Sequence, residues 1–174
     1  YTLLFNDDYP SWLYEVKMGA TTIWERWNSV MPDGHISGTG MNSLNHYAYG
    51  PVVEWMYRNM IGIRPVAEAP GFRKAQIKPQ PDYRMQWAKM ELRSAAGIYH
   101  VGWKMEAPAE NGSRKMHISV TVPFNAEAEV WLPDADAGEI AGGVQDGNTV
   151  KVSLDAGEYE FVYMTTKPYT KPYS

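Results

Sequence analysis

The chain contains no cysteine among its 174 residues, which excludes disulfide bonds, thiolate zinc sites and cysteine nucleophiles. An excess of positive charge is also absent, because 16 lysine and arginine residues stand against 20 aspartate and glutamate residues, a formal net charge of −4. This balance of charge does not favour binding to a phosphate backbone, so we expect no nucleic acid partner. Without cysteine, the composition leaves the compartment open between cytoplasm, periplasm and exterior.

Long apolar runs are missing as well. Hydrophobic residues make up 44% of the chain, yet no run approaches the roughly 20 residues that a membrane-spanning helix needs, so we expect no membrane span. The sequence begins with Tyr1 and shows no leader pattern, which we interpret as the start of a fragment.

Motifs for metals and cofactors are absent too. The four histidines, at positions 35, 46, 100 and 117, show no ligand spacing. The sequence has no glycine-rich phosphate loop and no nucleophile elbow. We therefore predict neither a metal nor a cofactor.

The first 64 residues predict helices. Ser11 is a good N-cap for a helix over residues 12–18, and Gly19 stands where a left-handed residue ends helices. A second helix is predicted from Asn42 or Ser43 to near Gly62, kinked or divided at Gly50-Pro51.

From about Pro65 the apolar residues alternate with polar ones, as in half-buried strands, and turn residues separate the alternating segments. Many short strands of this kind predict an antiparallel β-sandwich. The expected fold class is therefore α+β, with domains over residues 1–64 and 65–174. The alternating apolar sets are Ala88, Met90 and Leu92; Tyr99, Val101, Trp103 and Met105; Met116, Ile118, Val120 and Val122; Val150, Val152 and Leu154; and Tyr159, Phe161 and Tyr163.

The candidate catalytic residues lie within the first 64 residues, where Glu25 stands between Trp24 and Trp27. Apolar walls increase the basicity of a carboxylate, and aromatic planes stack on the C–H faces of sugars, so this group suits a general acid or base of glycoside hydrolysis. The alternative is structural: the two tryptophans anchor a core, and Glu25 pairs with Arg26 or with a helix N-terminus. His46 has the same two interpretations, a ligand contact or a structural group.

These residues carry a resemblance to a known family. The segments YPSW at 9–12, GATTIWERW at 19–27 and MNSLNHYAYG at 41–50 resemble the C-terminal part of bacterial α-L-rhamnosidases of glycoside hydrolase family 78. Further matching stretches are Glu54-Trp55, Gly62-Ile63-Arg64-Pro65, Pro70-Gly71-Phe72, Pro79-Gln80-Pro81 and Trp87-Ala88-Lys89.

The resemblance implies a fold and a reaction. Residues 1–64 are expected to be the last helices of an (α/α)6 catalytic barrel, and residues 65–174 a C-terminal β-sandwich. Such enzymes remove terminal α-L-rhamnose from glycosides with inversion. Glu25 falls on the family's general base and His46 on a residue that contacts rhamnose, with Trp24 and Trp27 as further substrate-binding candidates. The general acid is expected upstream in the rest of the parent chain, so the isolated chain should be inactive.

Two other functions stay open at this point. The chain could be a carbohydrate-binding or structural β-sandwich module in which Glu25 is only a polar contact. It could also derive from a different (α/α)6 glycosidase that acts on another sugar. A rhamnose-containing glycoside or polysaccharide is the expected partner in the first interpretation, and substrate profiling separates it from the last.

Overall fold

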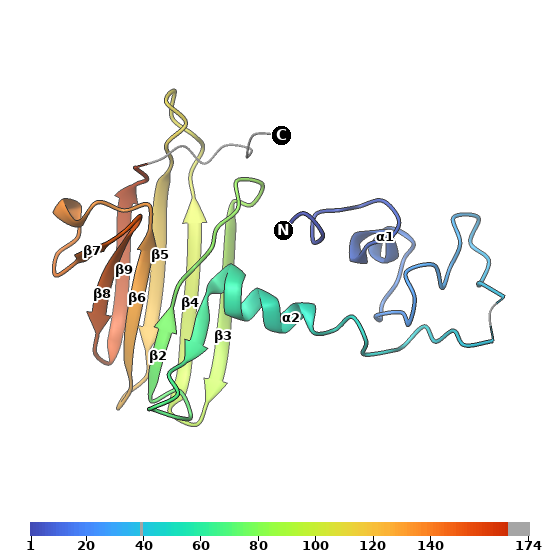
Figure 1. The fold of residues 1–174 in the computed structure, drawn as a ribbon, viewed down its shortest axis with the longest axis horizontal. Helices are drawn as coiled ribbons and strands as arrows, with labels where there is room; N and C mark the ends of the chain where they lie inside the picture. Colours follow the sequence, from blue (N-terminus) through green and yellow to red (C-terminus); the bar gives the residue numbers. More distant parts are fainter. Residues whose placement is uncertain (39, 167–174) are drawn as a thin grey trace. The chain divides into compact units, whose positions relative to one another are not determined.

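The structure is a computed structural model that describes residues 1–38 and 40–166. The chain forms two compact units, Tyr1–Glu54 and Trp55–Ser174, and most of their helices and strands are labelled in Figure 1. The first unit contains one complete short helix, the start of a second helix and long turns, and the second contains all of the described strands. The class is mixed α and β, as the sequence predicts.

Helix α1 (Trp12–Lys17) lies where the capping residues place it. The buried Ser11 hydroxyl accepts a hydrogen bond from the Tyr14 backbone N–H at 3.0 Å. The chain leaves the helix through Gly19, which has φ of 84°. Because only glycine adopts this left-handed conformation without strain, the helix ends there.

The predicted helix from residue 42 is wrong over its first half. Residues 42–51 form turns, and helix α2 (Val52–Trp55) begins only after Pro51. The reason lies in the backbone hydrogen bonds, since Ser43 and His46 pair with a distant segment of the same unit instead of with a helical turn. Proline at position 51 adds to this, because it disfavours helical geometry in the residue before it.

Helix α2 continues into η1 (Met56–Ile61), a π-helix that ends at the left-handed Gly62. The π-helix η1 belongs to the second unit, where the Trp103 indole donates a 2.9 Å hydrogen bond to the Met60 carbonyl. The compact units therefore divide at residues 54 and 55, ahead of the domain boundary that the sequence predicts at 64 and 65.

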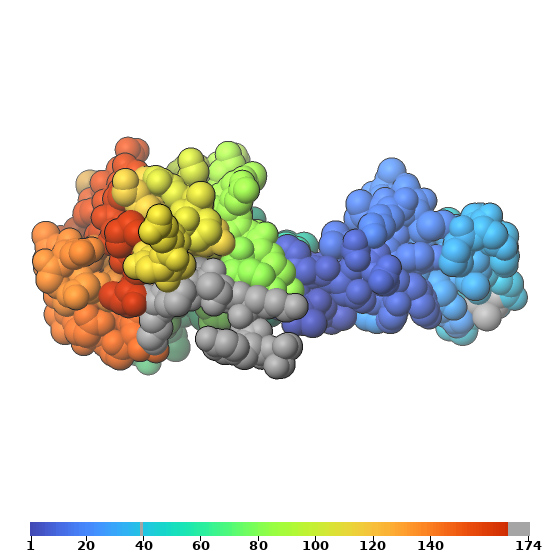
Figure 2. Space-filling model, turned by 90° about the horizontal axis from the view of Figure 1, so that it is seen from above, coloured from blue at the N-terminus to red at the C-terminus, as the bar shows by residue number. Residues whose placement is uncertain are grey.

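The second unit is a sandwich of two stacked sheets (Figure 1). One sheet has the order β1-β2-β6-β8-β7 and the other β3-β4-β5-β9. Edge strands β7 and β3 lie at opposite sides of this unit, as the orange and green surfaces of Figure 2 show. The strands are β1 (Ile63–Pro65), β2 (Lys74–Ile77), β3 (Trp87–Ser94), β4 (Gly97–Met105), β5 (Lys115–Val122), β6 (Glu127–Pro133), β7 (Val144–Asp146), β8 (Thr149–Leu154) and β9 (Gly157–Met164), with the 3-10 turn η2 (Ala137–Glu139) between β6 and β7.

One described strand pair departs from the predicted antiparallel arrangement. β2 and β6 pair in parallel, while the other described pairs are antiparallel. Between β2 and β6 the chain crosses to the other sheet, forms β3, β4 and β5, and returns. A long crossover of this kind can join parallel strands, which a tight hairpin cannot.

The core of the sandwich contains most of the alternating residues that the sequence singles out. It also contains Ile77, Val130 and Leu132, which lie outside those sets, whereas Met90, Leu92, Tyr159 and Phe161 are only half-buried. Apolar side chains of β4, β5, β6 and β8 point between the sheets and are almost fully buried. Tyr99 lies among them, and burial raises its pKa to about 12 while its hydroxyl donates to the Phe72 carbonyl at 2.7 Å. The largest buried apolar residues are Tyr99, Ile77, Met116, Ile118, Leu132, Val101, Val120, Val130 and Val150.

Candidate active site

The segment that carries Glu25 is held by the segment that carries His46. The Glu25 backbone N–H donates to the Ser43 carbonyl at 2.8 Å, and the His46 N–H donates to the Ile23 carbonyl at 2.8 Å. The Thr22 hydroxyl also donates to the Leu44 carbonyl. Two motifs that are about 20 residues apart in sequence therefore lie side by side in the first unit.

The Glu25 carboxylate has a fixed position. Its Oε2 atom accepts a 2.8 Å hydrogen bond from the Ser43 backbone N–H, and the side chain is half-buried. Within the described part of the chain, Oε1 has no hydrogen-bond partner. A carboxylate that is anchored through one oxygen and unoccupied at the other can accept a proton from water.

The His46 ring is oriented by its neighbours. Its Nδ1 atom accepts a 3.1 Å hydrogen bond from the Ala48 backbone N–H, so in the neutral imidazole the hydrogen sits on Nε2. The ring stacks on Tyr47 with centroids 5.1 Å apart and planes 9° from parallel. His46 therefore presents a donor nitrogen that a sugar hydroxyl can use.

The two candidate tryptophans occupy different environments. Trp24 is buried, with 3% of its surface exposed, whereas Trp27 is half-buried. The Trp27 ring stacks on Tyr49 with centroids 4.6 Å apart and meets Trp12 edge-on at 5.9 Å. The Trp12 indole N–H donates to the Tyr49 carbonyl at 3.2 Å, which fixes this group of three rings.

Glu15 is a functional candidate that sequence reasoning missed. Only 3% of the residue is exposed, and its Oε2 atom accepts a hydrogen bond from the Trp24 backbone N–H at 3.4 Å. Its Oε1 atom is buried with no hydrogen-bond partner among the described residues. Glu15 lies three positions after Trp12 on α1, and this helical spacing was the one sequence signal that places it on the same side of the helix as Trp12.

Burial raises the pKa of Glu15 above its ordinary value of 4.5, although the hydrogen bond from Trp24 opposes this shift. The folded unit then binds the proton more tightly than the unfolded chain does, so its stability falls as pH rises from about 4.5 through the raised pKa. We expect Glu15→Gln to remove this dependence. Hydrogen exchange over residues 12–27, corrected for intrinsic rates, measures it.

The exposed Glu110 supplies the control for that experiment, because Glu110→Gln should keep the pH dependence of the wild type. If Glu15→Gln lost protection with rising pH as the wild type does, another group would be responsible for the effect.

Residues 1–38 and 40–166 contain no group of three or more histidine or acidic side chains placed to hold a metal ion. In the same residues no helix has the length and apolar character needed to cross a bilayer.

Comparison with known families matches both parts of the chain. Residues 1–60 match the bacterial α-L-rhamnosidase 6-hairpin glycosidase domain, and residues 62–146 match the bacterial α-L-rhamnosidase C-terminal domain. An α-L-rhamnosidase of Alteromonas sp. (strain LOR) is 40% identical over 163 residues, which cover 92% of this chain and 17% of the relative. An α-L-rhamnosidase of Streptomyces avermitilis is 41% identical over 133 residues, 76% of this chain and 12% of the relative.

Solved structures agree with these matches. The Streptomyces avermitilis α-L-rhamnosidase complexed with L-rhamnose superposes with a TM-score of 0.78 at 34% identity, covering 92% of this chain and 15% of that chain. The native α-L-rhamnosidase of Aspergillus terreus gives a TM-score of 0.77 at 32% identity, covering 94% and 16%. This chain thus spans less than a fifth of the length of these relatives.

The class that these matches define is the glycoside hydrolases. Within that class, the chain belongs to the bacterial α-L-rhamnosidase family, of which it carries part of the 6-hairpin domain followed by the C-terminal domain. The resemblance found in the sequence is confirmed, and the fold agrees with a C-terminal β-sandwich fragment.

Proposed function

We propose that the parent protein cleaves terminal α-L-rhamnose from rhamnose-containing glycosides by an inverting mechanism, with Glu25 as general base. The observation that carries this proposal is the anchoring of the Glu25 carboxylate by the Ser43 N–H within the segment that matches a glycosidase domain. Relatives that are named α-L-rhamnosidases support rhamnose as the sugar that is released.

The proposed reaction needs two carboxyl groups with different roles. In an inverting glycosidase one carboxylic acid protonates the departing oxygen, and a carboxylate about 6.5–9.5 Å away deprotonates the attacking water. Glu25 takes the second role, because its Oε1 atom has no hydrogen-bond partner within the described residues. The general acid is proposed to lie in another part of the parent chain.

The remaining site residues are proposed to bind the sugar. The His46 Nε2–H donates to a rhamnose hydroxyl, since the Ala48 N–H occupies Nδ1. Trp27, stacked on Tyr49, offers the more accessible aromatic surface, while the buried Trp24 supports the segment that carries Glu25. In the parent, residues 1–64 complete the catalytic barrel, and residues 65–174 form the domain that follows it.

The test is a substrate panel given to the full-length parent. We expect release of the aryl group from an aryl α-L-rhamnopyranoside and no comparable release from aryl glycosides of glucose, galactose or mannose. Proton NMR of the first product should show β-L-rhamnose, since inversion changes the anomeric configuration. Cleavage of another sugar alone would replace the substrate, and α-L-rhamnose as first product would contradict inversion.

The isolated 174-residue chain is expected to release no aryl group from the same substrate. Removing the general acid and most sugar contacts abolishes both proton transfer to the leaving group and positioning of the substrate. Turnover by this chain would show that its own residues complete the catalytic pair.

A further inference from the structure

The outer face of the β3-β4-β5-β9 sheet carries a groove with a glycine at its centre. Gly102 of β4 lies between Lys89 of β3 and Ser119 of β5 in the strand register. A side chain at position 102 would meet the Ser119 hydroxyl at 3.2 Å and the Lys89 Cβ at 3.3 Å. The missing side chain therefore leaves a hollow in a face that neighbouring side chains otherwise cover.

The hollow opens to two connected clefts that share Lys89, Gly102 and Ser119. One has a volume of about 300 Å³ and the other about 400 Å³, at the lower end of the ~300–1,000 Å³ that is typical of ligand pockets. We call the pair the Gly102 groove. The first cleft is lined mainly by Trp87, Lys104, His117 and Glu160, and the second by Glu91 and His100, besides the shared residues.

Trp87 gives the first cleft an aromatic wall. It begins β3 opposite Lys104, with 56% of its surface exposed, and the Lys89 ammonium lies 5.9 Å from its ring centroid. An exposed indole is costly to leave in water and offers both an apolar face and an N–H donor. Such a surface suits the C–H face of a pyranose ring.

Hydrogen-bonding groups surround this wall. The Ser119 hydroxyl has no hydrogen-bond partner within residues 1–38 and 40–166. His117 lies between two carboxylates, with Nε2 2.8 Å from Glu106 and Nδ1 3.8 Å from Glu160. These groups provide donors and acceptors at the scale of neighbouring sugar hydroxyls.

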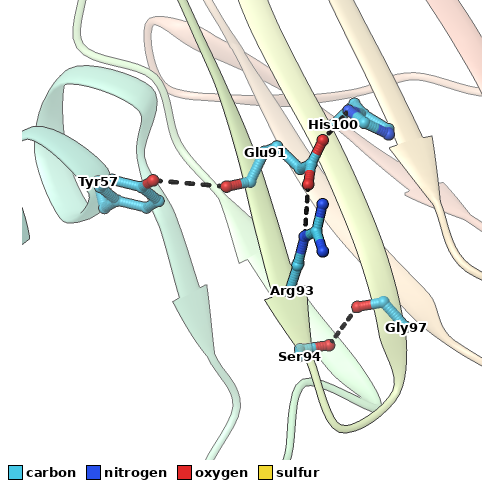
Figure 3. A network of polar contacts seen from close by, with 6 residues as sticks. All are labelled: Tyr57, Glu91, Arg93, Ser94, Gly97 and His100. Atoms are coloured by element: carbon cyan, nitrogen blue, oxygen red, sulfur yellow. Dashed lines mark hydrogen bonds and ion pairs between the residues drawn. The ribbon is translucent and has the colours of Figure 1, made fainter.

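Glu91 is the central polar residue of the second cleft. Figure 3 shows its carboxylate between Arg93 and His100, with Oε1 2.8 Å from the Arg93 Nε atom and Oε2 4.0 Å from the His100 Nδ1 atom. The Arg93 guanidinium holds the pKa of Glu91 below its ordinary value, so this carboxylate remains an acceptor at neutral pH. His100 lines the same cleft two residues before Gly102 on β4.

We propose that the Gly102 groove of the β-sandwich binds a neutral pyranose unit of a carbohydrate chain. The charges of the lining support a neutral ligand, because two ammonium groups (Lys89 and Lys104) balance two carboxylates (Glu91 and Glu160). The aromatic wall and the mixed donors and acceptors select a polyhydroxylated ring over an apolar or anionic partner. This site does not depend on the proposed hydrolytic activity.

The test is a titration of the 174-residue chain with methyl α-L-rhamnopyranoside and methyl α-D-glucopyranoside, followed by the backbone and indole N–H signals in two-dimensional NMR. We expect a saturable shift of the Trp87 indole signal with at least one probe. Trp87→Ala should weaken binding at least tenfold, and Gly102→Val should abolish the shift, because the new side chain fills the hollow.

Three controls keep the result interpretable. Phe124→Ala removes another aromatic side chain, 82% exposed and outside the groove, and should leave the affinity unchanged within twofold. Ser119→Ala, a small change on the sheet face, should weaken binding without altering the fold. Trp27→Ala tests the first unit: binding that is lost there and kept in Trp87→Ala would overturn the groove while supporting the proposed function. The absence of a saturable Trp87 shift with both sugars would also overturn the proposal.

Discussion

Replacing Glu25 by glutamine in the full-length parent is expected to lower kcat for an aryl α-L-rhamnoside by about 10²–10⁴-fold, the usual contribution of a general base. Glutamine keeps the size of the side chain, and its carbonyl can still accept the Ser43 N–H, so the local backbone should persist. It cannot take a proton from water. KM should change little, because the loss falls on the transition state instead of on substrate binding.

The measurement is the steady-state rate of aryl release by the wild type, Glu25→Gln and Glu110→Gln. Glu110 is exposed in the turn between β4 and β5, so its change should leave kcat unaltered. The general-base role would be excluded if Glu25→Gln retained kcat within about threefold, since loss of proton abstraction costs far more. A rise in KM with kcat unchanged would instead make Glu25 a binding residue.

Local rules predicted much of the fold because the deciding contacts lie close in sequence. Ser11 caps α1 through the Tyr14 N–H three residues later, and Gly19 supplies the left-handed backbone that ends the turn. In the second unit, strict alternation places Val101, Ile118 and Val120 inward, because successive side chains of a strand point to opposite faces.

Long-range backbone pairing explains what was not predicted. Residues 42–51 have a composition that permits helix, but the Ser43 carbonyl accepts a hydrogen bond from the Glu25 N–H, and the His46 N–H donates to the Ile23 carbonyl. Helix propensity depends on the local sequence, so it cannot predict hydrogen bonds to residues about 20 positions away. Glu15 was missed for the same reason, since its burial depends on the Trp24 backbone, which approaches from outside its own helix.

The same contrast applies to the candidate site. The string around Trp24, Glu25 and Trp27 stood out because aromatic rings beside a carboxylate suit glycoside chemistry, yet their individual exposures depend on packing. Trp24 is buried and Trp27 lies against Tyr49. Spacing alone could not separate these environments, because the residues that pack on the two rings come from other parts of the unit.

Gly62→Ala is expected to destabilise the second unit by about 3–5 kcal/mol, among the larger effects that one substitution produces. Gly62 ends η1 with φ of 89°, where its N–H donates to the Tyr57 carbonyl at 3.0 Å. A Cβ atom there would stand 2.0 Å from the Lys78 carbonyl oxygen. Since Lys78 also donates its N–H to the Gly62 carbonyl, neither backbone can move away without breaking their pairing.

Gly142→Ala separates the two causes of this loss, which are the left-handed backbone strain and the clash of the new Cβ with the Lys78 carbonyl. Gly142 lies in the same unit with a similar φ of 72°, but no atom lies within 4 Å of its Cβ position. It should therefore cost only the left-handed strain, about 1–2 kcal/mol. Urea unfolding followed by the β-sheet circular dichroism of strands β1–β9 gives both values. Equal losses of unfolding free energy at the two positions would mean that the end of η1 relaxes away from Lys78. A larger loss at Gly62 shows that the close contact between the end of η1 and the end of β2 stabilises this corner of the sandwich.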